Sequence, residues 1–231
     1  METVKTILVS LVSLTDIMRT RILEHARKTF FQSGFYRITM DELAHDLGIS
    51  KKTLYKHVPS KEILLQETLR QFMDQNEVIF QRIVENPTGS VLEKLQQLFM
   101  QLGTNIATIS PQFTEDLRRY APDLWQVVDR RRMQFMHTYL RPLIEAGIQE
   151  GMIRKEIPPD FFFLIYTTLI QQILNPESLS RLPFTLQQAF ILVMQIVFQG
   201  TLTETAQKKF QKWIRNQGIP AKNHPYVEKE R

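Results

Sequence analysis

The chain has 231 residues, of which 43% are hydrophobic and 23% charged, as is typical of a soluble globular protein with a real core. It contains no cysteine, which excludes disulfides and thiolate metal ligands and favours a reducing, cytoplasmic compartment. Lys and Arg number 29 against 24 Asp and Glu, a net charge of +5. This excess favours an acidic partner.

The N-terminal segment is apolar between residues 7 and 14. This run is far shorter than the ~20 residues that span a bilayer, and a secretory signal is the less favoured interpretation. We expect residues 1–15 to form a flexible or weakly ordered arm. Met18 directly precedes a clear helical pattern, so Met1 and Met18 are both candidate translation starts.

Residues 16–48 predict two helices. Apolar positions between residues 16 and 33 fall three and four apart, and Gly34 provides the left-handed residue at which many helices end. A short helix follows, in which Thr39 and Glu42 have the spacing of a capping box. Gly48 then closes this helix.

Residues 50–89 predict a second short helix and a long one. Ser50 caps "KKTLYKH", and Pro59 ends it because the residue before a proline avoids helical geometry. Ser60 caps a helix that reaches about residue 85, before turn signals at residues 86–89. Two short helices joined by a glycine turn and braced by longer helices indicate a compact domain of the helix-turn-helix type over residues 16–65.

The rest of the chain continues the helical pattern, and no stretch alternates strictly enough to predict a strand. We expect helices over residues 91–109, 112–120, 122–150, 160–174, 185–202 and 204–216. Pro142 lies inside the third of these and should bend it. The sequence thus predicts an all-α fold, with a larger helical domain over residues 66–218 and a mobile polar tail over residues 219–231.

Between Ser50 and Lys61 the chain has four lysines and no acidic residue. On a short capped helix, lysines and hydroxyls would form one exposed face, which fits the DNA major groove and can meet phosphates or base edges. The alternative is a solvated lysine-rich face. The candidate DNA-binding residues are Thr39, Ser50, Lys51, Lys52, Thr53, Tyr55, Lys56, His57 and Lys61.

Residues 21–65 resemble the DNA-binding domain of the TetR family of bacterial transcription regulators. The apolar stripe of the first helix, "TMDELA", "GISKKTLY" and "SKE" all occur in the family's order. The resemblance implies a three-helix DNA-binding domain followed by a larger helical domain. It also implies a double-stranded DNA operator as partner.

The resemblance assigns roles to the candidates. It implies phosphate contacts for Thr39 and Lys61, groove entry for residues 50–53, and backbone contacts for Tyr55 and His57. Three positions depart from the family pattern, and they are Lys52, Val58 and Ile63. Lys52 stands where a small residue is common, so the DNA sequence that is read stays open.

Two segments, residues 160–174 and 185–202, are apolar around most of their circumference. A helix of this kind is buried on two sides. One side can be the domain core and the other a second subunit, as the resemblance also implies, so we expect a homodimer through these segments. Two symmetric reading helices would require a roughly palindromic operator.

Aromatic residues and methionines on the middle helices are candidates for an apolar ligand pocket, and the resemblance implies an inducer site there. They are Phe99, Met100, Trp125, Phe135, Met136, Tyr139 and Tyr166. For any single one of them, a plain core position is the favoured alternative. Arginines 118, 119 and 130–132 could meet an acidic ligand, but solvated helix faces are the favoured interpretation.

No catalytic or metal-binding pattern is present among the histidines, and adjacent acids such as Glu115 and Asp116 are interpreted as surface residues. We expect no enzyme, cofactor or metal site. The favoured function is a homodimeric transcription repressor released by a small apolar or amphipathic ligand. The alternative is a DNA-binding adaptor whose larger domain binds a protein. A helical enzyme or a membrane-surface protein is less favoured.

Overall fold

The computed structural model describes residues 2–175, 177–178 and 184–216, and the tail predicted over residues 219–231 lies outside them. All the named elements within these ranges are helical, and the only β-type pairing there is an isolated bridge between Ile153 and Leu202. The prediction of an all-α fold is confirmed. The helices are α1 (Glu2–Ser33), α2 (Met40–Asp46), α3 (Lys51–His57), α4 (Lys61–Glu85), α5 (Val91–Ala107), α6 (Pro111–Tyr120), α7 (Pro122–Phe135), the π-helix η1 (Met136–Leu140), α8 (Arg141–Gln149), α9 (Pro159–Ile173), α11 (Leu186–Thr201) and α12 (Glu204–Asn216).

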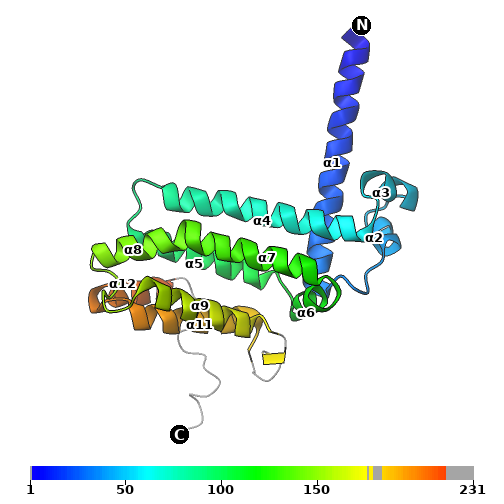
Figure 1. Cartoon of the computed structure of the whole chain (residues 1–231). Helices are drawn as coiled ribbons and strands as arrows, with labels where there is room; N and C mark the ends of the chain where they lie inside the picture. The colour runs from blue at the N-terminus through cyan, green and yellow to red at the C-terminus, as the bar shows by residue number, and fades with distance from the viewer. Residues whose placement is uncertain (1, 176, 179–183, 217–231) are drawn as a thin grey trace.

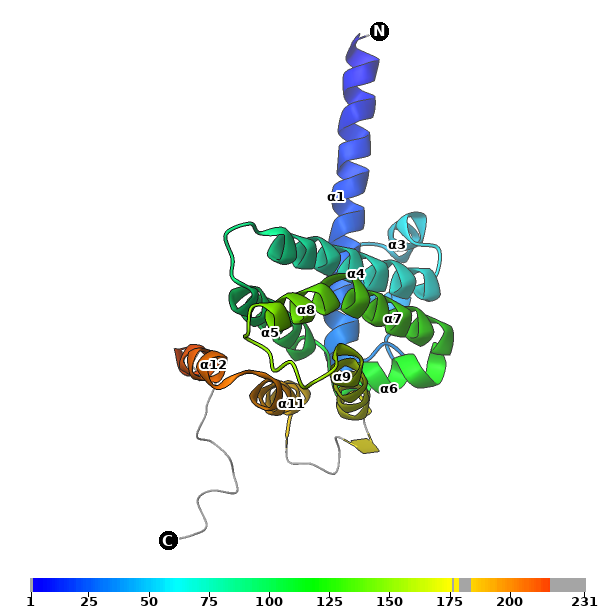
Figure 2. The same ribbon diagram turned by 60° about the vertical axis from the view of Figure 1, so that its left-hand side comes forward.

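The unit predicted to bind DNA, called the DNA-binding unit below, consists of the second half of α1 together with α2, α3 and the start of α4. Figures 1 and 2 show α2 and α3 beside α1 at one end of the molecule, while the first turns of α1 project away from the other helices. The structure thus continues α1 as a helix back to Glu2, through the segment expected to be an arm. Its weak order stays a prediction.

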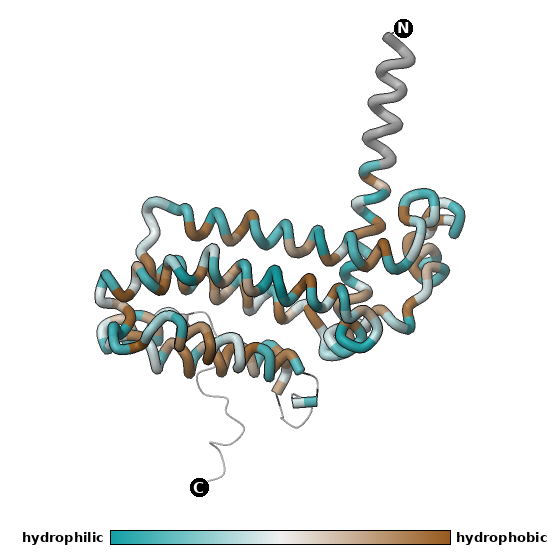
Figure 3. Tube along the Cα trace, viewed as in Figure 1, coloured by the Kyte–Doolittle hydropathy of each residue, from teal (hydrophilic) through white to brown (hydrophobic). Residues whose placement is uncertain are grey.

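The larger domain is layered. Figures 1 and 2 place α5, α7 and α8 between α4 on one side and α9, α11 and α12 on the other. Figure 3 shows hydrophobic residues recurring along α9 and α11. The domain core forms where the middle helices meet these two, and its centre includes Phe99, Phe190 and Phe198.

The DNA-binding unit has a second core, and α6 of the larger domain contributes to it. Phe30 and Phe31 of α1 are fully or almost fully buried there, and Phe113 and Leu117 of α6 pack into the same cluster. The two domains therefore share apolar packing, and α6 is the helix that joins them.

The predicted helix over residues 122–150 is present as α7, η1 and α8 in continuous succession. Pro142 stands at the start of α8, directly after the π turn, in which the N–H of Arg141 donates to the carbonyl of Met136. A proline has no N–H to continue the α-helical pattern, and the wider turn accommodates this. The distortion expected at Pro142 thus takes the form of a π turn.

No helix among the described residues is long and apolar enough to cross a membrane. Within the same residues, no group of three or more His, Cys, Asp or Glu side chains could hold a metal ion.

Candidate DNA interface and ligand cavity

The turn between α2 and α3 is built by the local hydrogen bonds that the sequence predicts. The Glu42 N–H donates to Thr39 Oγ1 at 3.2 Å, and the Thr39 N–H donates to Glu42 Oε2 at 2.7 Å. Gly48 has φ 66°, which an L side chain rarely adopts. Ser50 Oγ accepts from the Thr53 N–H at 3.0 Å and caps α3. The predicted capping box, glycine turn and second cap are all present.

Helix α3 has one buried side and one exposed side. Leu54 and the residue after the helix, Val58, are 0% exposed and anchor it in the core. Lys51, Lys52, Tyr55 and Lys56 are exposed on the outer side, and Thr53 and His57 are half-buried. This separation places basic side chains together on the outer side of the helix, where they can meet a polyanion.

The lysines of α3 are not equivalent. Lys51 Nζ lies 2.8 Å from Asp41 Oδ1 of α2, and the hydrogen bond to Asp41 raises the pKa of Lys51. Lys52 and Lys56 have no ion-pair partner among the described residues. Sequence reasoning missed the Lys51 pair because Asp41 lies ten positions earlier in the chain. Lys52 and Lys56 are the lysines most available for DNA.

Lys61, at the start of α4, has an internal partner. Its Nζ donates to the backbone carbonyl oxygen of Tyr36 at 2.8 Å, and burial lowers its pKa. The side chain therefore ties α4 to the loop between α1 and α2. A phosphate contact by Lys61 stays a prediction.

Helix α6 holds the same loop from the other side. Asp116 Oδ2 accepts from the Tyr36 N–H at 2.8 Å, and the Tyr36 ring stacks on Tyr120 with centroids 3.7 Å apart. Gly34 has φ 78°, and a Cβ there would lie 2.5 Å from Asp116 Oδ2. The interpretation of Asp116 as a surface residue was wrong, because it is only 3% exposed. An acidic residue within the apolar α6 stripe of Phe113 and Leu117 was the available signal.

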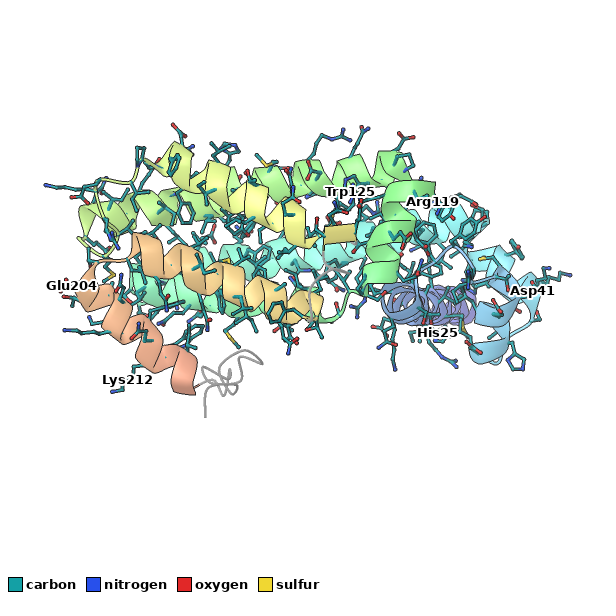
Figure 4. The ribbon with its side chains drawn as sticks, turned by 90° about the horizontal axis from the view of Figure 1, so that it is seen from below. His25, Asp41, Arg119, Trp125, Glu204 and Lys212 are labelled. Carbon is teal, nitrogen blue, oxygen red and sulfur yellow. The ribbon has the colours of Figure 1, made fainter. Side chains whose placement is uncertain are left out.

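A cavity of about 240 Å³ lies between α4, α5, α6, α7 and α9. Its walls are mainly apolar, and they include Phe31 of the DNA-binding unit as well as Phe72 and Phe80 of α4. Figure 4 places Trp125, which lines the cavity, between Asp41 at one end of the molecule and Glu204 at the other. The cavity thus touches both α4 and α6, which hold the loop between α1 and α2.

Four of the seven residues predicted for a ligand pocket line this cavity. They are Trp125, Phe135, Tyr139 and Tyr166. Phe99 and Met136 are buried elsewhere in the core, and Met100 lies on a separate, more open groove of about 580 Å³ beside Trp213. Sequence periodicity could not separate these groups, since all seven lie on inward faces. Arg131 and Arg132 also line the cavity, contrary to their interpretation as a solvated face.

The helices predicted for dimerisation carry exposed apolar side chains. On α9, Phe161 and Leu164 are 55% and 59% exposed, and Ile196 of α11 is 66% exposed. The opposite sides of both helices are buried in the domain core. Each helix therefore has apolar surface on two sides.

Helix α3 is capped, has a buried anchor and a basic outer face, and follows the equally short capped helix α2. This arrangement is that of a helix-turn-helix DNA-binding protein. Comparison with known proteins identifies the kind more closely. Residues 22–68 match the family model for bacterial regulatory proteins of the tetR family.

Full-length relatives match most of the chain. It is 30% identical over 183 residues to YvaF of Bacillus subtilis, an uncharacterized HTH-type transcriptional regulator, and the match covers 79% of this chain and 95% of YvaF. It is also 30% identical over 194 residues to the transcriptional repressor KstR2 of Mycobacterium tuberculosis, covering 80% and 94% of the two chains.

Solved structures agree. A structure of the ketosteroid transcriptional regulator KstR2 of Mycobacterium tuberculosis has a TM-score of 0.57 at 27% identity and covers 81% of this chain and 96% of that one. A TetR-family regulator from Marinobacter aquaeolei has a TM-score of 0.67 at 18% identity, with coverage of 86% and 97%. The chain belongs to the tetR family. It is a DNA-binding transcriptional regulator and not an enzyme.

Proposed function

We propose that the protein is a cytoplasmic repressor that binds a palindromic operator as a homodimer and leaves it when a small apolar or amphipathic molecule occupies the cavity. The observation that carries this proposal is the position of the cavity. Its walls include side chains of α4 and α6, the two helices that hold the loop between α1 and α2. A ligand there would act directly on the support of the DNA-binding unit.

DNA reading is assigned to α3. The exposed Lys52 and the half-buried Thr53 stand at its start, where groove-entering helices contact bases. Lys56, Tyr55 and His57 follow and suit phosphate contacts. Substitution of Lys52 or Thr53 should therefore change which sequence is preferred, whereas His57→Ala should weaken binding to all DNA. Selection of sites from a random DNA pool by the purified protein, followed by sequencing, measures both effects and tests for palindromy.

Dimerisation is assigned to α9 and α11. Their exposed apolar residues would be buried by the same surface of a second copy, in a two-fold arrangement. Leu164→Glu should yield monomers, because it would bury a charge without a partner. Val78→Glu is the control, since Val78 is also an exposed apolar residue but lies on α4. Analytical ultracentrifugation distinguishes these outcomes. A dimeric Leu164→Glu protein would contradict the assignment.

The release mechanism is a population shift. A ligand that binds the cavity better when α4 and α6 are displaced would favour that state, in which the two reading helices no longer have the operator's spacing. The M. tuberculosis relative is described as a repressor and as a ketosteroid regulator, which supports repression and an apolar ligand. Operator affinity that stays the same with a saturated cavity would contradict this mechanism.

The adaptor alternative predicts a filled interior in the larger domain. The cavity of about 240 Å³ with its apolar lining favours the ligand-responsive repressor instead.

A further inference from the structure

The polar groups of the cavity wall differ in whether they have partners. Asn76 Oδ1 accepts from Asn105 Nδ2 at 2.7 Å. Asn76 Nδ2 donates to the Phe72 carbonyl oxygen and Asn105 Oδ1 accepts from Gln101 Nε2, so both amides are engaged. Glu77 Oε2 forms an ion pair with Arg131 Nη1 at 2.5 Å. Asp129 is paired with an Nη atom of Arg132. Asn76, Asn105, Glu77 and Asp129 are therefore already engaged.

Two donors on the wall are not engaged. The Nε atom of Arg132 is buried and has no hydrogen-bond partner. Tyr166 is 3% exposed, and its hydroxyl makes no hydrogen bond with any described residue. Both residues line the same cavity. Burial raises the pKa of Tyr166 to about 12, and the charge of Arg132 acts in the opposite direction. A buried polar atom without a partner, as Arg132 Nε is, is rare in native proteins and calls for an explanation.

We propose that the cavity takes an amphipathic monocarboxylate, with its hydrocarbon part among the aromatic residues and its carboxylate on Arg132 and Tyr166. A carboxylate has acceptor oxygens only, and a guanidinium donates to it in a planar fork. Because Asp129 uses one part of that fork, the free Nε and the phenol offer the ligand two donors. This inference rests on the proposed function, since it names the ligand class of the same cavity.

The inference also gives the ligand a fixed direction. Phe72 and Phe80 of α4 and Trp125 of α7 provide apolar wall, while Arg132 provides the charge. An uncharged molecule of the same shape would fill the apolar part but leave the Arg132 and Tyr166 donors without acceptors. A cationic one would place a like charge beside Arg132. Head-group preference is therefore the property that tests the inference.

The experiment compares decanoate, decanol and decylamine, which share one hydrocarbon chain. Binding is followed by the fluorescence of Trp125 in a Trp213→Phe protein, which keeps one of the chain's 2 tryptophans. We expect decanoate to bind at least about tenfold more tightly than decanol, as for a charge-assisted hydrogen bond, and decylamine to bind most weakly. Equal affinity for decanoate and decanol, or no binding of any of the three, would overturn the inference.

Substitutions test which residues cause the preference for decanoate over decanol. Arg132→Gln should reduce the advantage of decanoate over decanol to near unity while decanol affinity is kept, which also shows that the cavity is intact. Tyr166→Phe should reduce the advantage by a smaller factor. The control is Arg130→Gln, because Arg130 is an exposed arginine on the same helix. A preference that survives Arg132→Gln, or that is lost in Arg130→Gln, contradicts the assignment.

An operator-binding assay separates this inference from the proposed function. If decanoate binds through Arg132 but does not release operator DNA, the ligand class stands and the release mechanism fails. If decanol releases the operator as well as decanoate does, the release mechanism stands and the ligand class fails.

Discussion

Leu54 of α3 and Leu102 of α5 are both leucines on the inward side of a helix, but their surroundings differ. Leu54 is 0% exposed within the filled core of the DNA-binding unit. Leu102 is half-buried and lines the cavity of the larger domain. The DNA-binding unit is thus packed to fix one geometry, whereas the larger domain keeps space next to the helices that support it. A regulator needs a rigid reading surface and a support that can respond.

The largest expected effect tests this difference in packing. Leu54→Ala should lower the free energy of unfolding by about 2–5 kcal/mol, because it leaves a void in a filled core. Leu102→Ala should cost less than about 2 kcal/mol, because one side of Leu102 already borders empty space and loses fewer contacts. Urea unfolding at equal protein concentration measures both. Equal losses would mean that the two cores are packed alike.

The next largest effect is expected at Gly34 and Gly48, which form a matched pair of glycines. Both have positive φ, 78° and 66°, but a Cβ at Gly34 would meet Asp116 whereas one at Gly48 has nothing within 4 Å. Gly48→Ala should cost about 1–2 kcal/mol for its left-handed backbone. Gly34→Ala should cost more and should also reduce operator affinity, because the contact with α6 is disturbed. The same unfolding and DNA-binding assays apply. A Gly34→Ala protein no worse than Gly48→Ala would argue against a tight contact with α6.

Lysines at opposite ends of the molecule test which region meets DNA. Lys56→Ala on α3 should weaken binding to all DNA sequences. It should also reduce the slope of log affinity against log salt concentration by about one, the contribution of a single phosphate contact. Lys212→Ala should change neither quantity, because Lys212 lies on α12 at the far end in Figure 4. Fluorescence anisotropy over a salt series measures both. A comparable loss in the two variants would indicate nonspecific attraction by net charge.

The smallest effect concerns a feature that the two regions share. Hydrogen bonds from the Thr39 backbone and side chain lower the pKa of Glu42, and those from Ser90 lower the pKa of Glu93. A lowered folded-state pKa adds stability above the ordinary value of 4.5, and this stability is lost as the pH falls through the folded-state value. Glu42→Gln and Glu93→Gln should each lower the Tm slightly at neutral pH.

The pH dependence of these Tm differences tests whether the ionised carboxylates stabilise the two helix caps. Thermal melts followed by circular dichroism should show both variants converging with the unmodified protein as the pH falls from 4.5 through the lower folded-state pKa of each carboxylate. A difference in Tm that persists in acid would contradict a role for the ionised carboxylate. Convergence of one variant alone would show that the caps of α2 and α5 are not equivalent.

Much of the fold could be predicted because its signals are local. Caps at Thr39, Ser50 and Ser60 depend on residues within three positions, and the structure contains all three. The contacts of Lys51 with Asp41, and of Asp116 with Tyr36, join residues that are far apart along the chain. Such pairs depend on how helices cross, which periodicity does not specify. For the same reason, the sequence named seven inward aromatic and methionine residues but could not separate wall from core.

The π turn before Pro142 has a consequence for the register of the long helix. Each residue of an α-helix advances the side chains by about 100°, so one extra residue in a turn rotates everything that follows by that amount. Phe135 can therefore line the cavity while Leu143 and Ile144 are buried on the side that α8 presents to the core. Removing a single residue from η1 would restore a regular α-helix. Either Phe135 would then rotate away from the cavity, or Leu143 and Ile144 would rotate away from the core. The length of this segment is thus as much a determinant of the cavity as the aromatic residues on its wall.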